Sequence, residues 1–187
     1  MQILGSLVVG LVVGMSSFAT VVAEQAPPPP VAQSIVATKD VVDLMTKGNR
    51  ECVVMEHNSV FGGYVAALLI PRAKLTVVMA RFTDTTSMAY KLYQKDCMGA
   101  YADLTAAVDA MERVIVDDIN ANGLIALPKK DAPKDAFTRE GKTMKFDGDK
   151  AALKQAKMTA DDFNKAFAGA DETYTQLLLL LSKELKK

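Results

Sequence analysis

The chain has no tryptophan, one histidine and two cysteines, and aromatic residues make up only 6% of its 187 residues. A core without large rings has to be built from Leu, Val, Ala and Met, and this mix favours helices packed on helices. Lys plus Arg number 22, as do Asp plus Glu, which gives a formal net charge of zero. This balance argues against a nucleic-acid-binding protein, because phosphate binding needs a surplus of cations.

The residues that usually carry catalysis or bind metals are also scarce. His57 is the one histidine, whereas zinc sites and Ser-His-Asp triads need several converging groups. We interpret His57 as a half-exposed residue at the boundary of an element. Haem held by histidine and methionine is disfavoured too, because Met45, Met88, Met98 and Met111 lie at apolar stripe positions typical of core residues. We therefore predict no catalytic residue, no metal and no cofactor.

The amino-terminal residues 1–23 contain no charged side chain and are mostly apolar. Such a stretch is typical of a secretory signal peptide. It is also nearly long enough to cross a bilayer, so a membrane anchor formed by residues 3–23 is the alternative. Residues 24–37 follow as a spacer in which Pro27–Pro30 fix an extended rod. We expect residues 38–187 to form one helical domain that is periplasmic or secreted, or else anchored to the membrane.

In the first half of this domain, helical spacing competes with strand-like runs. Thr38 can cap a helix whose apolar residues recur at helical spacing. The pair Gly48-Asn49 is equally a helix stop, which would leave residues 50–56 as a short strand. Two apolar runs, 64–70 and 75–82, are compatible with helices that meet at a proline or with a strand hairpin. Their alanine content favours helices.

The second half shows a clearer helical pattern. Apolar residues fall three to five positions apart over residues 88–119, which predicts a long amphipathic helix that ends near Gly123. Residues 123–158 are rich in Pro, Gly and Lys, and they predict a loop-rich connection with a short helix at 150–157.

The last helix is predicted from residue 159 onwards. Thr159 and Asp162 form a variant of the capping box, and the apolar stripe that follows reaches Leu185. Five successive leucines, Leu177–Leu181, cover every side of such a helix. They predict central burial in a bundle, which we favour, or a leucine edge offered to another subunit of a homo-oligomer.

These elements predict an all-α fold, namely a bundle of about four helices running up and down. The connection between the third and fourth helices would be long enough to cross the bundle. The alternative is an α+β fold, in which residues 50–82 form a small meander against the two later helices.

Cys52 and Cys97 are the only cysteines. In an exported chain an even pair predicts a disulfide, which would tie the first helix to the long one. Two buried free thiols are the alternative. Redox or metal chemistry is disfavoured, because the CxxC spacing that it favours is missing.

Charge is distributed unevenly along the chain. Residues 99–121 carry five acidic residues and one arginine, a net charge of −4, whereas residues 123–158 carry nine basic and five acidic residues, a net charge of +4. The basic segment is expected either to fold back along the acidic half of the long helix or to form a mobile arm for an anionic envelope surface. The basic residues that would form such a patch are Lys129, Lys130, Lys134, Arg139, Lys142 and Lys145.

Two pairs of adjacent carboxylates, Asp117-Asp118 and Asp161-Asp162, could suggest acid–base chemistry. Neighbours on a helix point in different directions, however, so neither pair shares one site. We interpret the first pair as a solvated face and the second as a helix cap.

We predict an exported, non-enzymatic helical protein that binds another protein or an anionic component of the cell envelope. One alternative is a carrier of a small apolar ligand held between helices. Another is a hydrolytic enzyme, which the single histidine disfavours. We expect no nucleic-acid partner, and contact with a membrane only through an uncleaved amino-terminal segment.

Overall fold

The fold is that of a computed structural model, which describes residues 32–56, 63–70, 73–82 and 110–187. It combines helices with an antiparallel sheet, so the predicted all-α four-helix bundle is wrong and the fold class is α+β. The helices are α1 (Ser34–Lys47), α4 (Lys150–Gln155) and α5 (Ala160–Leu185). The strands are β1 (Cys52–Glu56), β2 (Gly63–Ile70), β3 (Lys74–Phe82), β4 (Ala110–Ile119), β5 (Ala136–Arg139) and β6 (Lys142–Lys145).

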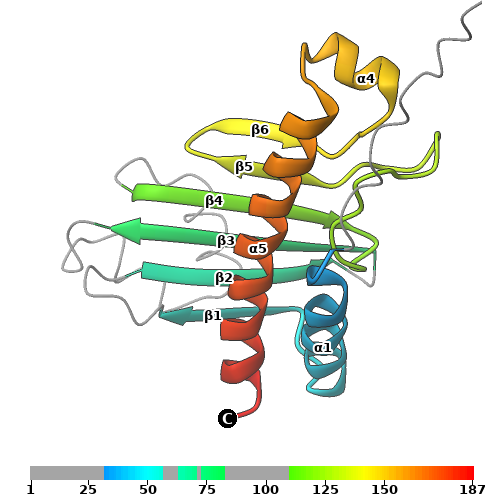
Figure 1. The fold of residues 1–187 in the computed structure, drawn as a ribbon. Coiled ribbons are helices and arrows are strands. Elements are labelled where there is room, and N and C mark those ends of the chain that lie inside the picture. The colour runs from blue at the N-terminus through cyan, green and yellow to red at the C-terminus, as the bar shows by residue number, and fades with distance from the viewer. Residues whose placement is uncertain (1–31, 57–62, 71–72, 83–109) are drawn as a thin grey trace, which may run out of the picture.

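The six strands form one sheet in which each strand pairs antiparallel with its neighbour in the sequence, in the order β1 to β6 (Figure 1). Ile70 lies opposite Lys74 where β2 meets β3, and Arg139 lies opposite Lys142 where β5 meets β6. The alternative prediction of a meander over residues 50–82 is right for β1 to β3. The same meander then continues through β4, β5 and β6, which the sequence patterns did not predict.

The apolar runs of β2 and β3 are strands, not the helices that their alanine content favours. Every residue from Gly63 to Leu69 is buried, although successive side chains point to opposite faces of the sheet. A strand buried on both faces is a continuous apolar run without alternation. Periodicity alone cannot distinguish such a run from a buried helix, and for this reason the prediction is wrong.

The predicted long helix is also wrong where the structure describes it, because residues 110–119 form β4. Val114 and Val116 are buried in the core, while the intervening Ile115 is only partly buried. Three successive apolar residues satisfy both a helical spacing and a strand alternation, so the pattern does not discriminate. The rest of that predicted helix, residues 88–109, lies outside the described residues.

Helices α1 and α5 pack against each other, and α5 crosses one face of the sheet (Figure 1). The predicted capping box is confirmed, because the Thr159 hydroxyl accepts from the Asp162 N–H at 3.1 Å and the Asp162 carboxylate accepts from the Thr159 N–H at 3.4 Å. Leu179 is 58% exposed, so α5 is not buried on every side and the favoured prediction of central burial in a bundle is wrong. The helix covers the sheet with one of its sides and leaves the other side open to water. The predicted stripe is confirmed at Phe163, Phe167, Ala170, Tyr174, Leu177, Leu178 and Leu181, which are all buried.

Helix α1 begins at Ser34, four residues before the predicted cap at Thr38 and within the predicted spacer. Its first turn is bound by Asp171 of α5, whose carboxylate accepts from the Gln33 N–H at 2.7 Å and from the Ser34 N–H at 3.1 Å. The helix ends before Asn49, which has a φ of 51°. The interpretation of Gly48-Asn49 as a helix stop before a short strand is therefore confirmed.

The predicted signal peptide or anchor, residues 1–23, lies outside the described residues, so both interpretations stay predictions. Within the described ranges, no helix combines the length and the apolar character needed to cross a bilayer.

Candidate functional site

The hairpin of β5 and β6 carries half of the predicted basic patch. Its two-residue turn is formed by Glu140 and Gly141, whose φ values of 49° and 77° are the positive angles of a type I′ turn. Thr138 and Thr143 face each other across the strands with their hydroxyl oxygens 2.8 Å apart. The sequence patterns predict a loop here. The overlooked signal is the Glu-Gly pair between two short alternating runs, which the many lysines obscure.

The six predicted patch residues lie in the loop before β5 and on the hairpin, and all except Lys134 are exposed. Lys134 forms an ion pair with Asp147, and Arg139 lies 3.5 Å from Glu112 of β4. Arg139 of the basic segment thus forms an ion pair with an acidic residue of the neighbouring strand, Glu112. Because Lys142 and Lys145 are three positions apart on one strand, their side chains lie on opposite faces. The six residues therefore do not form one continuous patch.

A groove of about 550 Å³ lies between β6, α4 and the beginning of α5. Of the six predicted patch residues, Lys134 and Lys145 line it. Its floor is apolar and includes Met144, Leu153, Met158 and Phe163. This combination of a wide apolar floor with nearby cations is the feature that the sequence patterns miss, because its parts come from separate elements.

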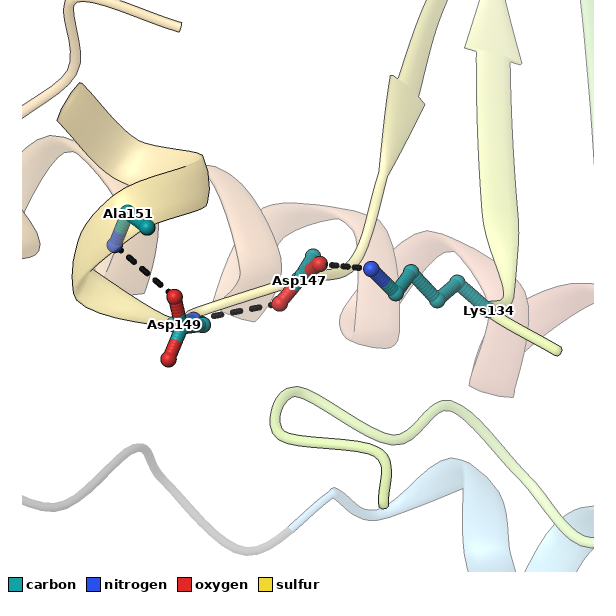
Figure 2. Close-up of polar contacts among 4 residues, drawn as sticks. All are labelled: Lys134, Asp147, Asp149 and Ala151. Atoms are coloured by element: carbon teal, nitrogen blue, oxygen red, sulfur yellow. Dashed lines mark hydrogen bonds and ion pairs between the residues drawn. The ribbon is translucent and has the colours of Figure 1, made fainter. Parts of the chain in front are cut away.

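A chain of polar contacts fixes the turn between β6 and α4 (Figure 2). The Lys134 ammonium pairs with Asp147, Asp147 accepts from the Asp149 N–H at 3.2 Å, and Asp149 accepts from the Ala151 N–H at 2.8 Å. The hydrogen bond from Lys134 holds the pKa of Asp147 below its ordinary value. Asp149 is the N-cap of α4, so this chain sets the position of the helix relative to the strand.

Buried packing holds the same turn from the inside. Phe146 is fully buried and meets Phe167 edge-on, with ring centroids 5.1 Å apart. The Gly148 N–H donates to the Ala126 carbonyl at 2.9 Å, and a Cβ at Gly148 would lie only 2.7 Å from Leu127. Both walls of the groove are therefore held in a defined geometry before any partner binds.

Helix α4 contributes apolar side chains without burying any residue completely. Leu153 packs at the margin of the core, and Ala152 and Ala156 line the groove beside it. A helix that is apolar on one side and yet not fully covered leaves space between itself and the sheet. That space is the groove.

The charge around the groove is positive. Residues 142–158, which form two of its walls, carry five lysines and two aspartates. Lys150, Lys154 and Lys157 are exposed, as is Lys145. The arrangement suits a ligand that carries both acidic groups and apolar side chains.

A second cluster of titratable residues lies where the loop between β4 and β5 meets the two long helices. Asp118 is fully buried, and its carboxylate accepts four hydrogen bonds. The donors are the Thr38 hydroxyl at 3.2 Å, the Tyr174 hydroxyl at 3.0 Å and the N–H groups of Asn122 and Gly123 at 3.0 and 2.8 Å. We call this cluster the α1–α5 junction; it comprises Thr38, Asp118, Asp135, Asp171 and Tyr174.

Burial raises the pKa of three residues of the junction. It raises the pKa of Asp118, and together with the charge of Asp118 it raises the pKa of Tyr174 well above its ordinary value. Burial also raises the pKa of Asp135 to about 7, although the N–H groups of Ile119 and Ile125 each donate to it at 2.8 Å. Both oxygens of each of these two carboxylates are occupied by donors from the protein. The junction therefore holds the loop in place and offers no open acid–base pair.

The adjacent Asp117 and Asp118 do not share a site, as predicted, but their interpretation as a solvated face is wrong for Asp118. Strand alternation sends the two side chains to opposite faces of β4. Asp117 pairs with Lys74 at 2.8 Å and accepts from the Thr76 hydroxyl at 2.9 Å, whereas Asp118 turns into the junction.

Four of the other residues that the sequence singles out, His57, Met88, Cys97 and Met98, lie outside the described residues. Cys52 lies in β1 and is not a free thiol; because it is the one cysteine in the described part, no disulfide joins two described residues and its pairing with Cys97 stays a prediction. Met45 is buried in the core, as expected. Within the described ranges, no three His, Cys, Asp or Glu side chains come together where they could hold a metal ion.

Comparison of the chain with protein families, curated proteins and solved structures finds no match. The functional inference therefore depends on the geometry of the groove and the chemistry of its lining.

Proposed function

We propose that this protein is an exported, non-enzymatic binding protein, and that its groove holds an acidic and partly apolar polypeptide segment of a partner protein. The observation that carries this proposal is the groove itself. With its volume of about 550 Å³, it combines an apolar floor with Lys134, which precedes β5, and Lys145 of β6, and the exposed lysines of α4 lie nearby.

The floor and the lysines contribute different things to binding. An apolar side chain that leaves water for a site such as that formed by Leu153 and Phe163 contributes about 1.5–3 kcal/mol. An exposed pair between a carboxylate and Lys145 contributes under about 1 kcal/mol. Such charges mainly speed association and select partners of the right sign. We therefore assign most of the affinity to the floor and the preference for acidic partners to the lysines.

The polar side chains of the groove suit binding better than catalysis. Lys134 and Asp147 are engaged with each other, and the Thr143 hydroxyl is engaged with that of Thr138. None of the described residues that line the groove is histidine, serine or cysteine. A nucleophile and a general base therefore do not converge there.

Export is proposed from the uncharged residues 1–23 and the proline-rich spacer that follows. Fractionation of the native cells, with amino-terminal sequencing of the product, tests it. We expect a chain shortened at its amino terminus in the periplasmic or secreted fraction, or a full-length chain in the membrane. An intact chain in the cytosol contradicts export.

Fluorescence anisotropy tests the binding, with a labelled peptide that alternates glutamate and valine as the probe. We expect the purified protein to bind this peptide and to bind a lysine–valine peptide much more weakly. Leu153→Asp should weaken binding about tenfold or more, which corresponds to about 1.4 kcal/mol. Leu179→Asp is the matched control, because Leu179 is an exposed leucine of α5 that does not line the groove.

A second pair of variants tests the charge. Lys145→Glu should weaken binding about fivefold, because it replaces an attractive contact by a repulsive one. Lys183→Glu makes the same change in charge near the end of α5 and should leave binding unchanged. Equal losses in the two variants would show that general charge attraction, and not the groove, recognises the peptide. Binding to vesicles of anionic phospholipid without binding to the peptide would also contradict the proposal.

A further inference from the structure

Strand β6 lies at the edge of the sheet and also forms one wall of the groove. Among the described strands it pairs with β5 alone. Three successive β6 residues, Thr143, Met144 and Lys145, line the groove. The proposed binding site therefore borders an open strand edge.

One hydrogen bond shows which backbone groups point to that edge. The Phe146 N–H donates to the Asp135 carbonyl at 2.9 Å, so the backbone of Phe146 faces β5. In an antiparallel pair, alternate residues direct their backbone groups to the partner strand. Met144 therefore faces β5 as well, whereas Thr143 and Lys145 direct their N–H groups away from it. A further strand would pair at these two residues, through both backbone groups of Thr143 and through the N–H of Lys145, because the Lys145 carbonyl already accepts from the Asp147 N–H at 3.0 Å.

The opposite wall leaves room for an extended chain. Ala152 and Ala156 lie one turn apart on the side of α4 that lines the groove. An added strand needs a spacing of about 4.8 Å from its neighbour, and small side chains on the facing helix provide this width. Leu153 lies on the same side and offers an apolar contact.

We infer that the acidic segment of the partner binds as an additional strand that is antiparallel to β6 and lies between β6 and α4. This inference rests on the proposed function and adds the mode of recognition to it. Strand addition of this kind takes its affinity from main-chain hydrogen bonds and its specificity from alternate side chains. The direction follows the sheet, in which all five strand pairs are antiparallel.

The register of β6 then determines the pattern of the segment. A partner residue opposite Met144 points to the helix side of the sheet, where Leu153 and Met158 contribute to the floor, so it should be apolar. The partner residues opposite Thr143 and Lys145 point to the other face, where the Lys145 ammonium favours carboxylates. The expected recognition pattern is acidic, apolar, acidic.

Lys145 also explains why an open edge can be tolerated. If two copies of the protein paired antiparallel through β6 with Met144 opposite Met144, Lys145 of each copy would lie opposite Thr143 and diagonal to Lys145 of the other, so like charges would come together. Lysines on edge strands are a common protection against such pairing. An acidic segment would be attracted by the same lysine that repels a second copy. The edge therefore disfavours pairing with a second copy and favours pairing with the partner.

The open edge also favours a polypeptide over a lipid surface. A lipid headgroup could meet the exposed lysines equally well, but it would leave the outward N–H groups of Thr143 and Lys145 unpaired. An extended peptide uses both features at once.

N-methylated peptides test the inference without altering the protein. In the proposed antiparallel arrangement, the N–H groups of the glutamates face β6 and those of the valines face away. Methylation of the glutamate nitrogens should therefore weaken binding about tenfold or more, as expected when several main-chain hydrogen bonds are lost. Methylation of the valine nitrogens in the same peptide should leave affinity within about twofold.

The outcomes separate this inference from the proposed function. If the unmodified peptide does not bind, the proposed function itself is wrong. If it binds and neither methylated series weakens binding selectively, the groove binds the peptide but not as a strand, and the inference is overturned. A loss confined to the valine series would show a parallel strand and would contradict the antiparallel arrangement.

Discussion

The α1–α5 junction and the groove use charged residues in opposite ways. In the junction, Asp118 is fully buried, and its carboxylate accepts hydrogen bonds from both long helices, by way of Thr38 and Tyr174, and from the loop after β4. In the groove, only Lys134 and Asp147 are engaged with each other, and Lys145 is exposed. The difference teaches that one region uses its charge to hold the fold together, while the other keeps its charge available to a partner.

The largest expected effect is on the junction side of this comparison. Asp118→Ala removes the acceptor of four donors, three of which are buried, and each buried donor costs about 1–3 kcal/mol when left unsatisfied. We expect the free energy of unfolding to fall by about 4 kcal/mol. Urea denaturation followed by circular dichroism measures this change.

Asp117→Ala is the control, because Asp117 is the adjacent residue but is only partly buried, where it pairs with Lys74 and accepts one hydrogen bond, from the Thr76 hydroxyl. We expect it to lower the free energy of unfolding by about 1–2 kcal/mol, half of the loss in Asp118→Ala or less. Similar losses for the two variants would show that the buried carboxylate of Asp118 contributes no more to stability than the partly exposed carboxylate of Asp117.

A slightly smaller effect is expected at Gly123, whose N–H is one of the four donors to Asp118. At Gly123, with a φ of 89°, an added Cβ would lie 2.5 Å from the Ile35 Cα. Backbone atoms cannot yield as a flexible side chain can, so Gly123→Ala should destabilise the protein by about 3 kcal/mol. Gly141 of the hairpin turn has a φ of 77° but no atom within 4 Å of an added Cβ. Gly141→Ala should therefore cost only about 1 kcal/mol, and equal melting temperatures would contradict this contrast.

The third prediction concerns pH and Asp135. Its pKa of about 7 in the folded protein is above the ordinary value of 3.8, so the folded state binds more protons than the unfolded state between these values. The contribution of Asp135 to stability therefore falls as pH rises from about 4 to 7 and is constant above that range. We expect a change on the order of 2 kcal/mol, less than the full shift implies, because water screens part of the site.

Comparison of the wild type with Asp135→Asn isolates this contribution, because the other carboxylates titrate in both proteins. The difference between their unfolding free energies should depend on pH between about 4 and 7 and be constant above about 7. A difference that stays constant across the whole range would show that Asp135 is ionised throughout.

The smallest effect on stability is expected in the groove. Lys134→Ala removes a partly exposed ion pair with Asp147 and should lower the free energy of unfolding by less than about 1 kcal/mol. It should nevertheless weaken binding of the glutamate–valine peptide about threefold, because the turn before α4 loses one of its fixed points. Loss of stability without loss of binding would place Lys134 with the residues that only support the fold.

The sequence predicts α5 best, because one apolar stripe and one cap both belong to a helix that is covered on one side. Thr159 begins the helix as expected, and Tyr174 and Leu178 are buried. The short helix near residue 150 is also predictable, because Asp149 provides a local cap. Where one face of an element is buried and its end is marked by local hydrogen bonds, sequence patterns are sufficient.

The sheet could not be predicted in the same way. Strand β2 is buried on both faces and so lacks alternation, and β4 places Val114, Ile115 and Val116 in a run that fits either period. The role of Asp118 depends on donors that are distant in sequence, Thr38 and Tyr174. The groove likewise combines β6, α4 and α5, so its existence follows only from tertiary packing.

The order of the elements along the chain has a consequence for how the domain acquires its fold. Each strand of the sheet pairs with the strand next to it in sequence, so the sheet can grow by adding one strand at a time in chain order. Helix α5, with its 26 residues, follows all six strands. When the chain is synthesised from its amino terminus, the apolar face of the sheet that α5 covers therefore stays exposed until residues 160–185 have been made. During that interval the nascent domain is most vulnerable to aggregation, and a chaperone would have most to do.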